Sequence, residues 1–105
     1  MIVTFEYDYL KDLFEVGKTQ GKKYRFQPQI IKAYQKVVRI LITSQTIETL
    51  WNFKSLHYEV LVGDKKGISS VKINDQYRLE FEVIQNNDDV LLTVCNLLEI
   101  SNHYS

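Results

Sequence analysis

The side chains of Arg78, His103 and Tyr104 suit the handling of a phosphodiester. The guanidinium can hold a phosphate through two parallel hydrogen bonds and stabilise charge on a phosphorane-like transition state. The imidazole and the phenol can exchange protons with a ribose 2′-hydroxyl and a leaving 5′-oxygen. Cleavage of RNA by its own 2′-hydroxyl requires positioning, charge stabilisation and proton transfer, so these residues predict a metal-independent site for RNA cleavage.

Purely structural roles are also open for the same three residues. Arg78 can pair with Glu80 or Glu82 across the face of a strand, and His103 and Tyr104 can belong to a frayed tail. The sequence by itself does not decide between these roles and catalysis.

Other types of chemistry find little support in the sequence. His57 and His103 are the only histidines and have no partner at metal-ligand spacing, so a structural zinc site is not expected. Cys95 lies in an apolar run, which favours a buried, inert thiol. Phosphate-binding loops, nucleophile elbows and dinucleotide fingerprints are missing from the sequence. We therefore expect no metal and no cofactor.

Charge is segregated along a chain of zero formal net charge. Seven basic residues and no acidic ones lie between Gly17 and Arg39, whereas the part from Leu79 onward has five acidic residues and no Lys or Arg. Lys65 and Lys66 lie on the predicted turn that precedes Arg78. This pattern can present a positive face to phosphates, although a solvated surface is the simpler explanation.

The elements that position these residues can be read from periodicity. In the first half of the chain we predict a strand at Met1–Phe5 and three helices, at Asp8–Val16 (ended by Gly17), Pro28–Ile42 and Ile47–Phe53. A polar loop, Lys18–Gln27, joins the first two helices. The helix from Pro28 has an apolar stripe, and Lys32, Lys36 and Arg39 lie on its opposite face. Trp51 is expected to be a core or helix-packing anchor.

After residue 58 the period changes from 3.6 to 2, which predicts strands. These are Tyr58–Val62, Ser69–Asn74, Tyr77–Ile84 and Val90–Ile100, with turns at 63–67, 75–76 and 86–89. In the third strand, Tyr77 and Leu79 alternate with Arg78, so we expect Arg78 to be exposed. Val90–Ile100 is apolar on both faces, as a strand covered on each side would be.

Helices first and an antiparallel meander afterwards indicate an α+β two-layer fold. A length of 105 residues predicts a single domain spanning 1–105. No apolar run approaches a membrane span, no export signal is recognisable, and Cys95 is the only cysteine. We therefore expect a cytoplasmic protein that does not associate with membranes.

One stretch of the chain resembles the core signature of HigB toxins, which belong to the RelE/ParE superfamily. It consists of Leu61-Val62-Gly63-Asp64-Lys65-Lys66-Gly67, followed by Ser70-Val71-Lys72-Ile73-Asn74-Asp75-Gln76-Tyr77-Arg78-Leu79-Glu80-Phe81. The likeness extends to the helices at Leu10–Gly17 and Pro28–Ile42 and to Val94–Tyr104, which is similar to the closing strand and its histidine-containing tail.

The resemblance implies a RelE-like fold and a toxin of a type II toxin–antitoxin system. Such a toxin would be a ribosome-dependent mRNA endonuclease that inhibits translation. A HigA-like helix-turn-helix antitoxin would neutralise it, and the pair would bind operator DNA only as a complex.

The resemblance also implies roles for individual residues. Arg78 matches the arginine that contacts the phosphate, and Lys65 and Lys66 match basic positions that follow Gly-Asp. His103 and Tyr104 correspond to the C-terminal acid/base pair, although the family often ends in Asp-Tyr-His. His57 corresponds to a histidine upstream of the signature. Lys32, Lys36 and Arg39 are predicted to contact ribosomal RNA.

Two other functions are compatible with the same fold. A non-enzymatic toxin of the ParE branch would bind DNA gyrase and would need no acid/base pair. A binding module without toxicity would need neither gyrase binding nor an acid/base pair.

Overall fold

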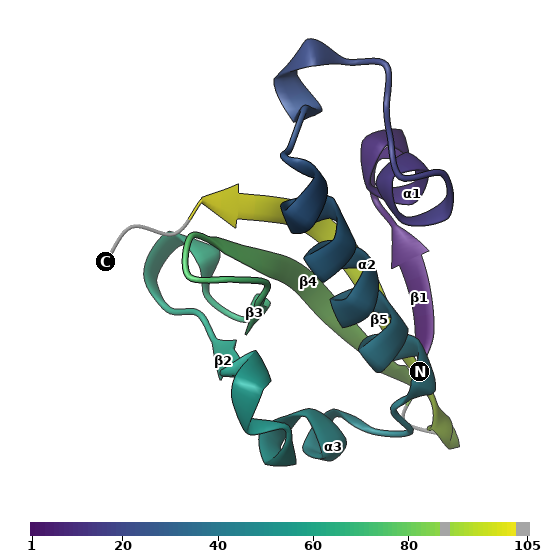
Figure 1. The fold of residues 1–105 in the computed structure, drawn as a ribbon. Coiled ribbons are helices and arrows are strands. Elements are labelled where there is room, and N and C mark those ends of the chain that lie inside the picture. The colour runs from purple at the N-terminus through teal and green to yellow at the C-terminus, as the bar shows by residue number, and fades with distance from the viewer. Residues whose placement is uncertain (87–88, 103–105) are drawn as a thin grey trace.

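Helices occupy the first half of the chain and most of the sheet the second half, as the sequence predicts (Figure 1). The structure, a computed structural model, describes residues 1–86 and 89–102. The helices are α1 (Asp8–Glu15), α2 (Pro28–Thr43) and α3 (Ile47–Asn52), with short 3-10 turns η1 (Lys22–Tyr24), η2 (Lys54–Leu56) and η3 (Gly63–Lys65). The strands are β1 (Ile2–Phe5), β2 (Glu59–Val60), β3 (Ser69–Lys72), β4 (Tyr77–Asn86) and β5 (Asp89–Asn102).

The five strands form one sheet in the order β1-β5-β4-β3-β2. The last four strands are an antiparallel meander, which confirms the predicted arrangement. β1 joins the other side of β5 and runs parallel to it, with Ile2 beside Val94 and Phe5 beside Leu97. The first strand therefore becomes part of the sheet only through the last one.

The core lies between α2 and one face of the sheet, so the α+β two-layer prediction is confirmed (Figure 1). Tyr34, Val38 and Leu41 of α2 are fully buried, as are Leu79 and Phe81 of β4. The Tyr34 hydroxyl, although buried, donates a hydrogen bond of 2.6 Å to the carbonyl of Leu10. This bond satisfies the one polar atom of the side chain and ties α2 to α1.

The ends of the first two long helices follow from local sequence. Gly17 comes directly after the C-cap of α1 and has φ +85°, a conformation that residues with a Cβ rarely adopt. Pro28 begins α2, where its missing N–H costs nothing. The ammonium group of Met1 donates hydrogen bonds to the carbonyls of Leu41, Ile42 and Ser44 at the end of α2, where positive charge is favourable.

The prediction that Trp51 anchors the core is wrong. Its side chain is 61% exposed, whereas Leu50 beside it is fully buried. α3 has only six residues and buries one narrow stripe, formed by Ile47 and Leu50. Trp51 follows Leu50 by one residue and is therefore turned about 100° away from that stripe.

Two predictions about strands also need correction. The strand expected at Tyr58–Val62 is limited to Glu59–Val60, and Val62 is 85% exposed. β5 is not covered equally on both sides: Cys95 and Leu97 face the core and are fully buried, but the alternating Asn96 and Leu98 are partly exposed. The apolar character of β5 therefore reflects one core face and one partly open face. Of the expected turn at 86–89, residues 87–88 lie outside the described residues.

Among the described residues, every helix is too short or too polar to cross a bilayer.

Candidate functional site

A row of polar residues crosses four strands on the sheet face opposite the core. The register places Glu59 beside Ser70, Ser70 beside Glu80, and Glu80 beside Glu99. These positions alternate with core residues such as Leu79 and Phe81, so their side chains lie on the other face. A register shift after Glu80 places both Leu98 and Glu99 near that residue.

Arg78 lies two residues before Glu80 on β4 and therefore on the same face. Its Nε donates a hydrogen bond of 2.6 Å to Oγ of Ser70, and its Nη2 donates one of 2.6 Å to the carbonyl of His57. Nη2 also reaches the Ser70 carbonyl at 3.2 Å, and Nε lies 3.5 Å from a carboxylate oxygen of Glu59. The guanidinium is thus held in one orientation by three neighbours.

The prediction that Arg78 is exposed is wrong, because only 11% of its side chain is accessible. The segment from η2 to β2 supplies His57 and Glu59 as its partners, and strand alternation alone cannot reveal that contact. The alternative structural role, a pairing of Arg78 with Glu80 or Glu82, is also absent among the described residues: Glu80 pairs with Lys65, and Glu82 accepts a hydrogen bond from Asn96.

His57 joins this cluster through its main chain. It follows η2 in the left-handed conformation, with φ 44° and ψ 52°, and this turn directs its carbonyl to Arg78. The imidazole itself is part of an exposed residue. The structure therefore brings His57 and Arg78 together, but through a backbone atom that motif matching does not indicate.

Lys65 holds the loop before β3 to the sheet. Its Nζ contacts both carboxylate oxygens of Glu80, at 2.9 and 3.2 Å, and lies 3.8 Å from Glu99. The hydrogen bond that Lys65 donates to Glu80 is the largest cause of a raised Lys65 pKa. Glu80 is 93% buried as a residue, so Lys65 neutralises a carboxylate that water reaches poorly. Lys66, the next residue, is exposed.

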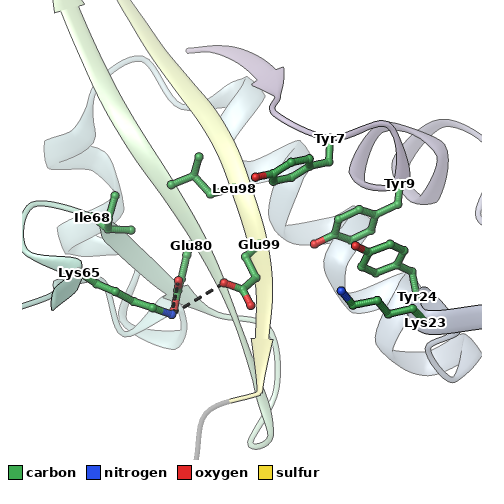
Figure 2. Close-up of a pocket in the computed structure, with 9 residues that line it drawn as sticks. All are labelled: Tyr7, Tyr9, Lys23, Tyr24, Lys65, Ile68, Glu80, Leu98 and Glu99. Atoms are coloured by element: carbon green, nitrogen blue, oxygen red, sulfur yellow. Dashed lines mark hydrogen bonds and ion pairs between the residues drawn. The ribbon is translucent and has the colours of Figure 1, made fainter. Parts of the chain in front are cut away.

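An open hollow of about 550 Å³ lies beside Glu80 and Glu99 (Figure 2). Its other side is aromatic: the rings of Tyr9 and Tyr24 are stacked, with centroids 3.7 Å apart and planes within 4°. Tyr7 adds a third ring, 6.3 Å from Tyr9, and Nζ of Lys23 lies 5.5 Å from the Tyr24 centroid. Burial raises the pKa of Tyr9 to about 12, so this phenol stays neutral at physiological pH.

The remaining predicted residues are not brought to this cluster. Lys32, Lys36 and Arg39 are exposed, as predicted, on the side of α2 that faces away from the sheet. They therefore lie on the opposite side of the molecule from Arg78. His103 and Tyr104 lie outside the described residues.

Sequence reasoning missed several members of the site. Glu59 could be found only from the strand register, since it does not stand out in the sequence. Ser70 opens the second stretch of the signature, but nothing in that motif indicates its contact with Arg78. The tyrosines at 7, 9 and 24 come from two separate segments, and nothing in their spacing predicts the stack.

Comparisons with known proteins agree with this architecture. A family model described as a RelE-like toxin of the type II toxin–antitoxin system HigB matches residues 3–95. A solved structure of a YoeB/ParE toxin from Agrobacterium tumefaciens is similar over 99% of this chain and 100% of that chain, with a TM-score of 0.58 and 14% sequence identity. At that identity the likeness shows the fold alone. No curated protein matches the sequence significantly.

Proposed function

The chain belongs to the HigB-like toxins, which are RelE-like toxins of type II toxin–antitoxin systems, and from that premise we propose that it is a ribosome-dependent endonuclease that cleaves mRNA and so inhibits translation. The observation that carries this proposal is the fixed guanidinium of Arg78 on the polar sheet face. A cation that is already held in place can stabilise the negative charge that develops on a phosphodiester in the transition state of cleavage.

The geometry suggests how a phosphate would enter. Glu59 is the weakest of the three partners of Arg78, at 3.5 Å, and its side chain is about half exposed. A phosphate oxygen can replace this carboxylate, while Ser70 and His57 keep the guanidinium in place.

In the proposed reaction the ribose 2′-hydroxyl attacks the adjacent phosphorus. The P–O5′ bond breaks, a 2′,3′-cyclic phosphate forms, and the 5′-oxygen leaves with a proton. Arg78 stabilises the charge on the non-bridging oxygens. His103 and Tyr104 are proposed to transfer the two protons, one from the 2′-hydroxyl and one to the 5′-oxygen. The exposed Lys66 is proposed to add positive charge, whereas the charge of Lys65 is already offset by Glu80.

The proposed partners follow from the same function. The exposed cations Lys32, Lys36 and Arg39 are proposed to contact ribosomal RNA in the cytoplasm, because they leave the opposite face free for mRNA. A HigA-like helix-turn-helix antitoxin is proposed to neutralise the toxin, and operator DNA would be bound only by that complex.

The test is induction of the chain in a bacterial host, with mapping of mRNA 5′ ends during translation. We expect new ends within translated frames, and we expect Arg78→Lys to abolish them because lysine keeps the charge but loses the planar fork. Arg25→Lys, at an exposed arginine outside the site and outside α2, is the matched control and should cleave like the parent chain. Thermal unfolding of both purified variants checks that they are folded.

Other outcomes would replace the proposal. Growth arrest with intact mRNA would indicate a toxin that binds gyrase, and no arrest would indicate a binding module.

A further inference from the structure

The hollow beside Glu80 and Glu99 has no role in the chemistry at Arg78, yet it lies on the same sheet face. Arg78 and Glu80 are separated by one residue on β4, which places the hollow about 7 Å farther along the strand. We propose that this hollow binds a base of single-stranded RNA, adjacent to the nucleotide at Arg78, by stacking it against Tyr7 and holding its phosphate with Lys23. This inference rests on the proposed function, because it concerns the same RNA strand.

The aromatic wall is the first support for a base site. Tyr7 is 57% exposed, although its ring lies beside that of Tyr9, and so it presents a flat apolar surface to solvent. The stacked rings of Tyr9 and Tyr24 stand behind it and tie α1 to η1, which gives the wall rigidity (Figure 2). Leu98 and Ile68 add apolar lining. Flat aromatic surfaces bind bases without regard to sequence, since every base has a π-face.

The distribution of charge in the hollow is the second support. Glu80 and Glu99 together carry two negative charges, and the Lys65 ammonium, within 4 Å of both, offsets one of them. Lys23, at the other side of the hollow, has no carboxylate within salt-bridge distance among the described residues. A cation beside aromatic rings is the combination that binds both the phosphate and the base of a single-stranded nucleotide.

A titration followed by NMR tests the proposal on the purified full chain. The protein carries isotope-labelled tyrosine rings, and the probe is a four-nucleotide single-stranded RNA with 2′-O-methyl riboses, which cannot be cleaved. We expect saturable shifts of the Tyr7 and Tyr24 ring signals. We expect Tyr7→Ala to weaken binding about tenfold, whereas Tyr7→Phe, which keeps the ring, should bind like the parent chain.

Trp51→Ala is the matched control, because Trp51 is a comparably exposed aromatic residue outside the hollow, and it should leave binding unchanged. Three results would overturn the proposal: ring signals that do not move at millimolar RNA, equal shifts with an abasic oligomer, or a mononucleotide that binds as tightly as the oligomer. The last result would assign the hollow to a free nucleotide.

The mRNA cleavage assay separates this inference from the proposed function. Ring shifts with the oligomer but no cleavage on translating ribosomes would overturn the endonuclease and leave the base site standing. Cleavage that is unaffected by Tyr7→Ala, together with unchanged ring signals, would overturn the base site and leave the endonuclease standing.

Discussion

Ser70 accepts two hydrogen bonds from Arg78, one at its hydroxyl at 2.6 Å and one at its carbonyl at 3.2 Å. The two residues lie on adjacent strands but are not directly paired, because the register places Ser70 beside Glu80. The contact is therefore diagonal, and it aligns the guanidinium along the sheet. Ser70 is 99% buried, so it acts on any substrate only by positioning Arg78.

Ser70→Ala should lower the rate of cleavage more than Ser69→Ala does, although each variant loses a hydrogen bond of a buried serine. The Ser70 variant removes the hydroxyl acceptor, which we expect to cost about 1–3 kcal/mol of unfolding free energy, since the bond is to a charged group. Ser69→Ala is the control: Ser69 is also buried and bonds to the Tyr58 hydroxyl at 2.9 Å, but on the core side. Urea denaturation and 5′-end mapping together check this. Equal losses of cleavage in both variants would show that Ser70 has only a structural role.

Lys65→Met should destabilise the protein by about 1–2 kcal/mol, because the Glu80 carboxylate would remain buried without its cation. Lys66→Met is the matched control. Lys66 is exposed and has no ion pair among the described residues, so its replacement should change the unfolding free energy by less than about 0.5 kcal/mol. Chemical denaturation measures both values. Equal unfolding free energies for Lys65→Met and Lys66→Met would contradict a stabilising role for the Lys65–Glu80 pair.

The stability of the protein should fall at alkaline pH partly because of Cys95. Burial raises the pKa of this thiol from 9.0 to about 11. The folded chain thus holds the proton more tightly than the unfolded chain, so this contribution is complete below pH 9 and disappears as the pH rises from 9 to 11. The shift corresponds to at most about 3 kcal/mol.

Cys95→Ala tests this assignment. Its unfolding free energy should decline less steeply between pH 9 and pH 11 than that of the parent chain, whatever the constant cost of the smaller side chain. If urea titrations give parallel curves of unfolding free energy against pH for the variant and the parent chain, the thiol does not contribute to the alkaline loss of stability.

Charge reversal on α2 should weaken binding to ribosomes. Single replacements of Lys32, Lys36 or Arg39 by Glu should each reduce the slope of log affinity against log salt by about 0.7–0.9, if each cation contacts one phosphate. Lys54→Glu changes the net charge equally from an exposed position in η2 and is the control. Filter binding at several salt concentrations measures the slopes. Equal effects of all four variants would indicate that only net charge matters.

Trp51→Ala should leave the unfolding free energy within about 0.5 kcal/mol of the parent value. Leu50→Ala should lower it by about 2–5 kcal/mol, because Leu50 is fully buried and its removal leaves a cavity. Thermal and chemical denaturation of the two variants compare neighbouring residues of one helix. A large loss of unfolding free energy in Trp51→Ala would contradict the exposed position of the Trp51 side chain.

The helices and the meander could be predicted because each carries its own periodic signal. The apolar stripe from Ile30 to Leu41 defines the buried face of α2, and alternation at Tyr77–Val83 defines that of β4. Local patterns do not say which strand lies beside which, so the parallel pairing of β1 with β5 could not be predicted.

The candidate site was only partly predictable for the same reason. Arg78 and Lys65 stand out by residue type and motif, and both lie on the polar face. The burial of Arg78 and two of its partners, the His57 carbonyl and Glu59, depend on the segment from η2 to β2. Lys65 instead pairs with Glu80 of β4 and lies near Glu99 of β5, which only the strand register brings together. The contact with the His57 carbonyl depends on a left-handed backbone at a histidine, which no local pattern specifies.

The parallel pairing of β1 with β5 has a consequence for how the protein is made. The hydroxyl of Thr4 on β1 bonds to the side chain of Asn96, 92 residues later, and at common rates of synthesis the chain between them takes roughly 5 to 20 s to produce. Contacts of such high contact order form late in folding. During translation the nascent chain can therefore form its helices but cannot complete the sheet, so any toxicity would arise only after the last strand has left the ribosome.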